Sequence, residues 1–104
     1  MLEIIEVRDP GRIRVRLRGE LDVAGAPVLR DALHRLGERR EPVLLDLDEL
    51  AFIDMSGLRV VMAAAEKALL EGGSFAVTRG SSQVRRLMAL VRLDGQLPLD
   101  PSAT

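Results

Sequence analysis

Residues 12–19 read RIRVRLRG, and this strict alternation constrains the fold more than any other segment of the chain. Apolar side chains take every second position, and arginines take the positions between them. Because side chains of a β-strand point alternately to opposite faces, the pattern predicts a strand with one buried face and one charged face. An apolar run at residues 2–8 precedes it, and the turn signal Asp9-Pro10-Gly11 makes the two segments an antiparallel hairpin.

The four arginines of this segment allow two interpretations. They could bind phosphates of a nucleic acid or a lipid, or they could form a solvated strand face paired partly with Glu3 and Glu6 of the neighbouring strand. We favour the solvated face, because one side of an antiparallel pair of strands commonly faces water. The 15 Lys and Arg side chains are offset by 16 Asp and Glu, whereas nucleic-acid-binding domains usually carry a basic excess. We therefore expect no direct contact with nucleic acid.

After the hairpin, helical and strand-like patterns alternate along the chain. Alternation of this kind predicts right-handed crossovers between parallel strands. We therefore predict an α/β fold of order β-β-α-β-α-β-α, with a mixed sheet of about four strands and helices mainly on one face. A short loop containing Phe52 and Ile53 is expected before the second helix. The expected helices have apolar stripes at residues 28–36, 58–69 and 84–91, and the expected strands cover residues 43–47 and 74–78.

Length and composition predict one domain, residues 1–104, with a loose, proline-containing tail at residues 97–104. The chain has no cysteine, which excludes a disulfide framework and a thiolate site. Its longest apolar run, VVMAAA at residues 60–65, is far shorter than the roughly 20 residues that span a membrane. The first residues lack a basic leader followed by an apolar block. We therefore expect a cytoplasmic protein that does not insert into a membrane.

Ser56 is the residue whose chemistry most needs an explanation. It stands immediately before the second expected helix, where its hydroxyl can cap the free N–H groups of the first turn. The same position can also carry a phosphate, because free amides and the helix dipole favour negative charge there. Gly57 would let a partner approach the backbone closely. Helix cap and phosphoacceptor are both open interpretations on these local grounds.

A catalytic role for Ser56 is poorly supported. The nucleophile elbow G-x-S-x-G needs glycines where this chain has Asp54 and Leu58. The single histidine, His34, lies far upstream on the first expected helix, in the wrong chain order for an α/β-hydrolase. We expect His34 at the surface or at its boundary, and we predict that the protein is not an enzyme.

Other loops offer no clear cofactor or metal site. The pair Gly72-Gly73 follows a helix, whereas a nucleotide-binding fingerprint precedes one. Residues 79–82, RGSS, open the third expected helix, where a plain cap is a better interpretation than an anion site. The acidic side chains between Asp46 and Asp54 lack the organised oxygen ligands that Mg²⁺ requires. We expect strand-end and loop roles for these carboxylates, and no bound cofactor or metal.

Three motifs, in order along the chain, resemble the STAS (sulfate transporter and anti-sigma factor antagonist) domain family, in particular its anti-sigma-factor antagonists. Residues 19–29, GELDVAGAPVL, are similar to the family's G-E-L-D followed by Ala-Pro. Residues 43–61, VLLDLDELAFIDMSGLRVV, are similar to its apolar strand, Asp-rich loop and D-x-S-G-L. Residues 74–90 resemble its closing strand and S-x-x-V-x-R-L-x-x-L. The resemblance covers nearly the whole chain and implies the STAS fold.

The resemblance also implies a regulator that switches between partners. The unphosphorylated form of such a protein binds an anti-sigma factor and thereby frees a sigma factor. The anti-sigma factor is itself a serine kinase, which phosphorylates the serine of D-x-S-G-L, here Ser56, and ends the binding; a separate serine phosphatase resets the protein. The implied partner-binding residues are Asp22, Asp54, Met55, Gly57 and Leu58.

The motifs depart from the family pattern at two positions. Gly25 stands where Ser or Thr often precedes Ala-Pro, which would weaken a helix cap. Met55 stands where some relatives carry a second serine, so Ser56 is the single acceptor in this loop. An alternative function is a non-switching STAS accessory subunit of a lipid-transporting ABC complex. The choice between a monomer and a weak homodimer stays open.

Overall fold

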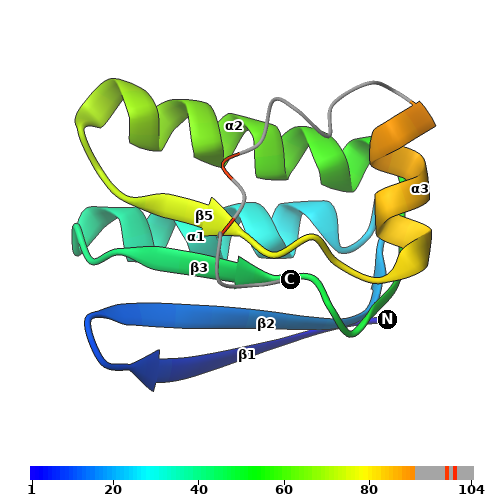
Figure 1. The fold of residues 1–104 in the computed structure, drawn as a ribbon, viewed down its shortest axis with the longest axis horizontal. Helices are drawn as coiled ribbons and strands as arrows, with labels where there is room; N and C mark the ends of the chain where they lie inside the picture. Colours follow the sequence, from blue (N-terminus) through cyan, green and yellow to red (C-terminus); the bar gives the residue numbers. More distant parts are fainter. Residues whose placement is uncertain (91–97, 99, 101–104) are drawn as a thin grey trace.

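The computed structural model describes residues 1–90 together with residues 98 and 100. Over this part of the chain, five strands and three helices form an α/β fold (Figure 1), which confirms the predicted class and the hairpin followed by alternating elements. Most of the predicted loose tail, residues 97–104, lies outside the described residues. The elements are β1 (Leu2–Asp9), β2 (Arg12–Leu21), α1 (Ala26–Glu38), β3 (Val43–Asp46), β4 (Leu50–Ile53), α2 (Met55–Glu71), β5 (Phe75–Val77) and α3 (Ser82–Leu90).

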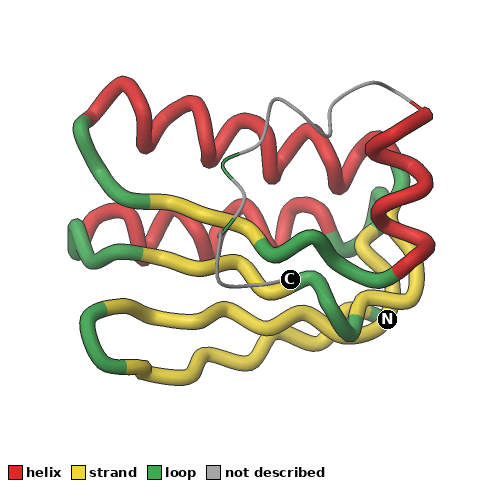
Figure 2. The backbone as a smooth tube through the Cα atoms, viewed as in Figure 1, coloured by secondary structure: helices red, strands yellow, loops and turns green. Residues whose placement is uncertain are grey.

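The strands of the described chain form one mixed sheet, whose path β1-β2-β3-β5 can be followed in Figure 2. β1 and β2 are antiparallel, and every other pair is parallel. β2 is long enough to pair with two strands in succession along one side. Its first half pairs with β3, and its end pairs with β4. β4 occupies the segment where a loop was predicted around Phe52 and Ile53. Its four residues are buried only at the two ends, so the sequence there carries no alternating pattern.

The boundaries of α2 follow from two residues with suitable chemistry. Asp54 precedes the helix in extended conformation, and its side chain accepts a hydrogen bond from the backbone N–H of Gly57. Gly72 follows the last turn with a φ of 71°, a left-handed conformation that glycine adopts without steric cost, and its N–H donates to the carbonyl of Ala68. The helix therefore has a side-chain cap at its start and a glycine cap at its end.

The core lies between the sheet and the two long helices, which pack against each other and against the same face of the sheet. The alternating apolar residues of β2 point into it, as the sequence predicts. α3 covers one end of the sheet beside β4 and adds Val84 and Met88. The completely buried core side chains include Val15, Leu17 and Leu21 of β2, Leu29 and Leu36 of α1, Leu45 of β3, Leu58 and Val61 of α2, and Val77 of β5.

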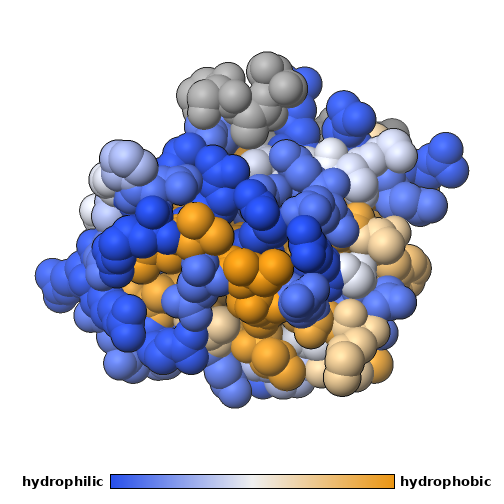
Figure 3. Space-filling view, turned by 90° about the horizontal axis from the view of Figure 1, so that it is seen from below, coloured by the Kyte–Doolittle hydropathy of each residue, from blue (hydrophilic) through white to orange (hydrophobic). Residues whose placement is uncertain are grey.

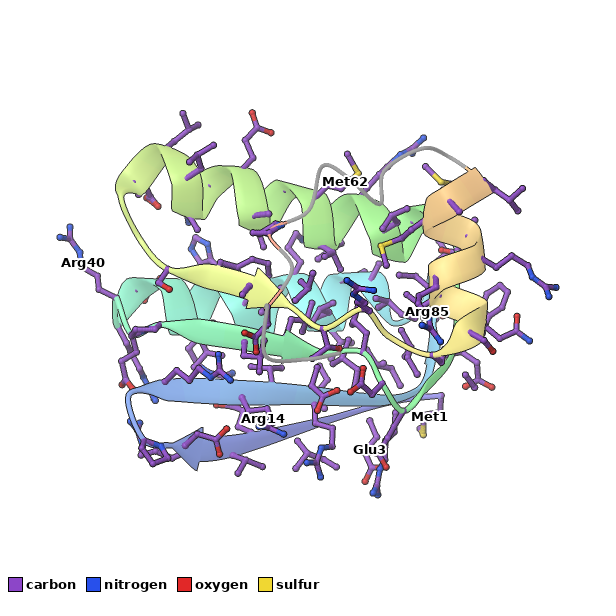
Figure 4. All side chains as sticks on the ribbon, in the orientation of Figure 1. Met1, Glu3, Arg14, Arg40, Met62 and Arg85 are labelled. Atoms are coloured by element: carbon purple, nitrogen blue, oxygen red, sulfur yellow. The ribbon has the colours of Figure 1, made fainter. Side chains whose placement is uncertain are left out.

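The arginines of β2 lie on the opposite face of the sheet, where they form ion pairs. Arg14 lies over the β1–β2 pair (Figure 4), with Nε 3.0 Å from Asp9 Oδ2. Arg16 and Arg18 reach Glu49 at 3.3 and 3.1 Å. Arg12 lies 3.2 Å from Asp100, whose backbone bonds to β5.

The predicted charged face is therefore confirmed, but its partners differ from the expected ones. Glu6 points to the helix side of the sheet and pairs with Arg35 of α1 at 2.7 Å. Glu3 stands opposite Arg18 in the β1–β2 register, yet forms no ion pair within the described part of the chain. The parity of β1 explains the first difference, because Glu6 and Glu3 are separated by an odd number of positions and face opposite sides.

Candidate functional site

The candidate site lies at the carboxyl ends of two neighbouring parallel strands. Leu21, the last residue of β2, pairs with Ile53, the last residue of β4, and an aspartate follows each of them. The backbone N–H of Asp54 donates to the carbonyl of Leu21 at 3.2 Å. The loops that begin with Asp22 and Asp54 are therefore adjacent, at the edge of the sheet where open α/β folds place their binding sites.

Asp54, and not Ser56, is the cap of α2. Its Oδ1 lies 3.1 Å from the N–H of Gly57, and its carbonyl accepts the N–H of Leu58 at 3.0 Å. The helix thus begins at Met55, which places Ser56 inside the first turn and corrects the predicted capping role of its hydroxyl. Aspartate and serine are equally good caps, so local preference alone could not separate the two residues. Within the described part of the chain, the half-buried Ser56 hydroxyl forms no hydrogen bond.

Asp22 organises the turn that leads into α1. Its Oδ1 accepts the N–H groups of Ala24 and Gly25, both at 3.1 Å, and its carbonyl accepts the N–H of Ala26 at 2.8 Å. Gly25 provides no side-chain cap, as the sequence implies, but Asp22 bonds the free amides just before it. A Cβ on Gly25 would lie 3.1 Å from the Cβ of Leu2, so close packing also favours glycine at this position.

Two of the predicted partner-binding residues are packed inward. Leu58 is completely buried in the core. Gly57 is also buried, and a Cβ there would lie 2.6 Å from the carbonyl oxygen of Leu21. Gly57 therefore allows α2 to seat against the end of β2, rather than allowing a partner to approach. Partner contact by these two residues stays a prediction, and Asp22, Asp54 and Met55 are the predicted residues with accessible side chains.

Exposed apolar side chains occur in the segments on either side of this edge, and sequence reasoning did not single all of them out. Met55 is 38% exposed, Phe52 of β4 is 46% exposed, and Val23 of the β2–α1 loop is 73% exposed. Phe52 is one of two aromatic residues in the chain. Its exposure was not predicted, because the strand that contains it was not predicted. Together with Asp22 and Asp54, these residues give the edge an apolar surface with carboxylates beside it, which we call the Ser56 edge.

His34 is not placed to act as a base for Ser56. Its Nδ1 lies 3.3 Å from Lys67 Nζ, and its Nε2 lies 3.4 Å from Glu38. Lys67 is eleven residues after Ser56 in α2, which corresponds to about 16 Å along the helix axis. The His34 side chain is 62% exposed, as its predicted surface position requires.

The remaining polar loops have structural roles, as predicted. Asp48 accepts the N–H of Gly80 at 3.2 Å, and Asp46 accepts the N–H of Asp48 at 2.9 Å. Ser81 caps α3 through the N–H of Val84 and donates to the carbonyl of Leu50 at 2.7 Å. Among the described residues, no group of three or more His, Cys, Asp or Glu side chains is arranged to hold a metal ion. None of the described helices combines the length and apolar character needed to cross a membrane.

Comparison with known proteins assigns the family. A family model described as "Mlab, STAS domain" matches residues 5–99. The chain belongs to the STAS domain family. The GELD motif of this STAS domain ends β2, and its D-x-S-G-L motif opens α2, so both motifs meet at the Ser56 edge.

Three relatives of this STAS domain carry informative names. The anti-sigma-B factor antagonist of Bacillus subtilis (strain 168) is 32% identical over 81 residues, which cover 78% of this chain and 74% of the relative. The anti-sigma F factor antagonist of Paenibacillus polymyxa is 33% identical over 91 residues, which cover 86% of this chain and 78% of the relative. The crystal structure of an anti-sigma factor antagonist from Mycobacterium paratuberculosis matches with a TM-score of 0.84 and 30% identity, over 97% of this chain and 86% of the other.

Proposed function

We propose that this STAS protein is an anti-sigma-factor antagonist whose binding is ended by phosphorylation of Ser56. The observation that carries the proposal is the position of Ser56. Its hydroxyl is left free by the Asp54 cap, and its chain neighbour Met55 exposes an apolar side chain. The names of three relatives, each about 30% identical to this chain, support the partner class.

In this proposal the unphosphorylated Ser56 edge binds a kinase-type anti-sigma factor, which releases its sigma factor. The kinase active site belongs to the partner, and a separate serine phosphatase restores the hydroxyl. Asp22, Asp54 and Met55 contribute accessible surface to the contact, with Phe52 and Val23 at its margin. The protein acts by binding and catalyses no reaction itself.

The charge added to Ser56 explains the release. A phosphoserine brings about −1.5 to −2 charges at pH 7. The N-terminus of α2 offsets part of this by roughly 0.3–1 kcal/mol, so the fold tolerates the group. A partner packed on the same edge would instead meet a hydrated dianion beside Asp54. A hundredfold loss of affinity requires only about 2.7 kcal/mol, which a like-charge contact at an interface can supply.

The proposal is tested by binding assays with two variants. We expect Ser56→Ala to bind the anti-sigma factor of the same organism in the presence of ATP, when the native chain is phosphorylated and released. We expect Ser56→Asp to bind at least tenfold more weakly than the unphosphorylated native chain, as measured by titration calorimetry. Equal affinities for the two variants would refute the switch, even if binding itself were found.

A second candidate function is a non-switching accessory subunit of a lipid-transporting ABC complex. The description of the matching family model, which names Mlab, supports this second candidate. The arginine face argues against lipid contact there, because Arg14, Arg16 and Arg18 are already paired with carboxylates. Mass spectrometry of the protein from its native cells separates the two: phosphate on Ser56 supports the switch, and its absence in every growth condition supports the accessory subunit.

A further inference from the structure

A long groove separates α1 from α2 on the surface of the molecule. Its volume is about 970 Å³, and it runs from Ser56 and Val23 at one end to Gly73 and Ser74 at the other. Between the helices it reaches down to residues of β3 and β5. Its apolar lining consists of Ala26 and Leu33 of α1, Val60, Ala63, Ala64 and Ala68 of α2, Val43 of β3 and Phe75 of β5.

One polar contact crosses this groove. Lys67 Nζ of α2 lies 3.3 Å from His34 Nδ1 of α1, and both side chains line the groove while being exposed to solvent. Glu38 lies 3.4 Å from the other ring nitrogen and orients the imidazole. The pair spans the groove above its apolar floor. The space beneath extends along α2 from Ser56 to Gly73 and has a largely apolar lining, which suits a hydrocarbon chain.

The charges around the groove are unevenly distributed. Arg30 and Arg59 lie toward the Ser56 end, and neither forms an ion pair within the described part of the chain. The carboxylates that line the groove, Glu41 and Glu71, lie at the other end. Arg8 bonds Glu41 at 2.6 Å, which lowers the pKa of Glu41 and neutralises its charge. Among the side chains that line the groove, the cations Arg30 and Arg59 therefore lie at the Ser56 end, where the carboxylates of Asp22 and Asp54 in the neighbouring loops bond backbone amides.

At the other end of the groove, near Gly73 and Ser74, the described lining has no cation directed into the groove as a counterpart of Arg30 and Arg59. Arg40 belongs to the groove lining, but its side chain projects away from the body of the molecule in Figure 4. A ligand with one anionic head and one apolar tail would consequently bind in one direction, with the head between Arg30 and Arg59.

We propose that the α1–α2 groove binds a free long-chain fatty acid, with its carboxylate beside Arg30 and Arg59 and its chain along the alanine-rich floor beneath the Lys67–His34 pair. The volume lies at the upper end of the roughly 300–1,000 Å³ typical of small-molecule sites, and such sites combine an apolar lining with a few polar groups. The inference does not depend on phosphorylation of Ser56.

The first test measures palmitate binding by titration calorimetry, below the concentration at which palmitate forms micelles. We expect one site per chain with a micromolar Kd. Ala64→Trp fills the groove and should abolish binding. Ala65→Trp is the matched control, because the neighbouring Ala65 is also half-buried but lies about 100° further around α2 and lines a different hollow, and it should bind as the native chain does. Circular dichroism checks that both variants fold.

The second test addresses the direction of the ligand. Ser56→Glu and Ser74→Glu place the same charge at opposite ends of the groove. We expect Ser56→Glu to raise the Kd for palmitate at least tenfold, and Ser74→Glu to change it less than threefold. The double variant Arg30→Gln/Arg59→Gln should also raise it at least tenfold.

Three outcomes would overturn the proposal. They are equal binding by Ala64→Trp and Ala65→Trp, equal affinity for palmitate and for the uncharged detergent dodecyl maltoside, and binding only to anionic phospholipid vesicles. None of these results bears on release of an anti-sigma factor, so failure here and failure of the proposed switch are distinguishable.

Discussion

At the scale of single residues, the cap of α2 and the free hydroxyl of its first turn belong to two different residues. The Asp54 carboxylate bonds the N–H of Gly57, and the Ser56 hydroxyl has no bond within the described part of the chain. The sequence placed both residues at the helix start, but two good capping residues two positions apart cannot be ranked by local preference. The packing of Gly57 against Leu21 decides the matter, because it fixes where the helix can begin.

This separation predicts unequal stability effects for two alanine substitutions. Asp54→Ala removes the cap of α2 and should lower the free energy of unfolding by about 0.5–2 kcal/mol. Ser56→Ala removes an unbonded hydroxyl and should change it by less than about 0.5 kcal/mol. Urea denaturation followed by circular dichroism measures both. A larger loss in Ser56→Ala than in Asp54→Ala would show that serine is the cap.

At the scale of elements, the long periodic segments could be predicted and the short one could not. β2 shows a strict period of two, and the apolar stripe of α1 repeats at helical spacing, so both were predictable from the sequence. β4 is held by pairing with the end of β2, a contact between residues about thirty positions apart that leaves no pattern in the four residues themselves. The exposed face of Phe52 went unrecognised for the same reason.

The end of α2 gives a prediction at the same scale. Gly72 has a φ of 71°, whereas its neighbour Gly73 has no positive φ. Nothing lies within 4 Å of a Cβ added to Gly72, so only backbone strain opposes a side chain there. Gly72→Ala should destabilise the protein by about 1–2 kcal/mol. Gly73→Ala is the control in the same turn and should cost clearly less; equal losses of thermal stability would contradict the left-handed cap.

At the scale of the whole molecule, β1 forms one free edge of the sheet. Seen from this side, Figure 3 shows apolar surface bordered by charged groups. The half-buried Ile4, Ile5 and Val7 of β1 are interspersed with the exposed charges of Glu3, Glu6 and Arg8. Charged side chains on an edge strand oppose pairing with a second chain. The fold class was readable from the sequence, but which strand remained at the edge depended on topology.

The charges on β1 should therefore keep separate molecules apart. Glu3→Ile extends the apolar run of the edge and should cause self-association that increases with protein concentration, measured by light scattering. Glu66→Ile is the control, because it removes the same charge from an exposed position of α2, a helix that is not paired with β1. If both variants scatter alike, hydrophobicity in general, and not the free edge, is responsible.

The free hydroxyl of Ser56 matters for the proposed regulation more than for the stability of the fold. In the proposed switch, a phosphate can be added to Ser56 and removed again without refolding of the chain, because Asp54 holds the start of α2. The lifetime of that phosphate would then be set by the proposed kinase and phosphatase. A protein of this design reports the balance of two opposing activities in its surroundings, at the cost of one phosphoryl group per cycle.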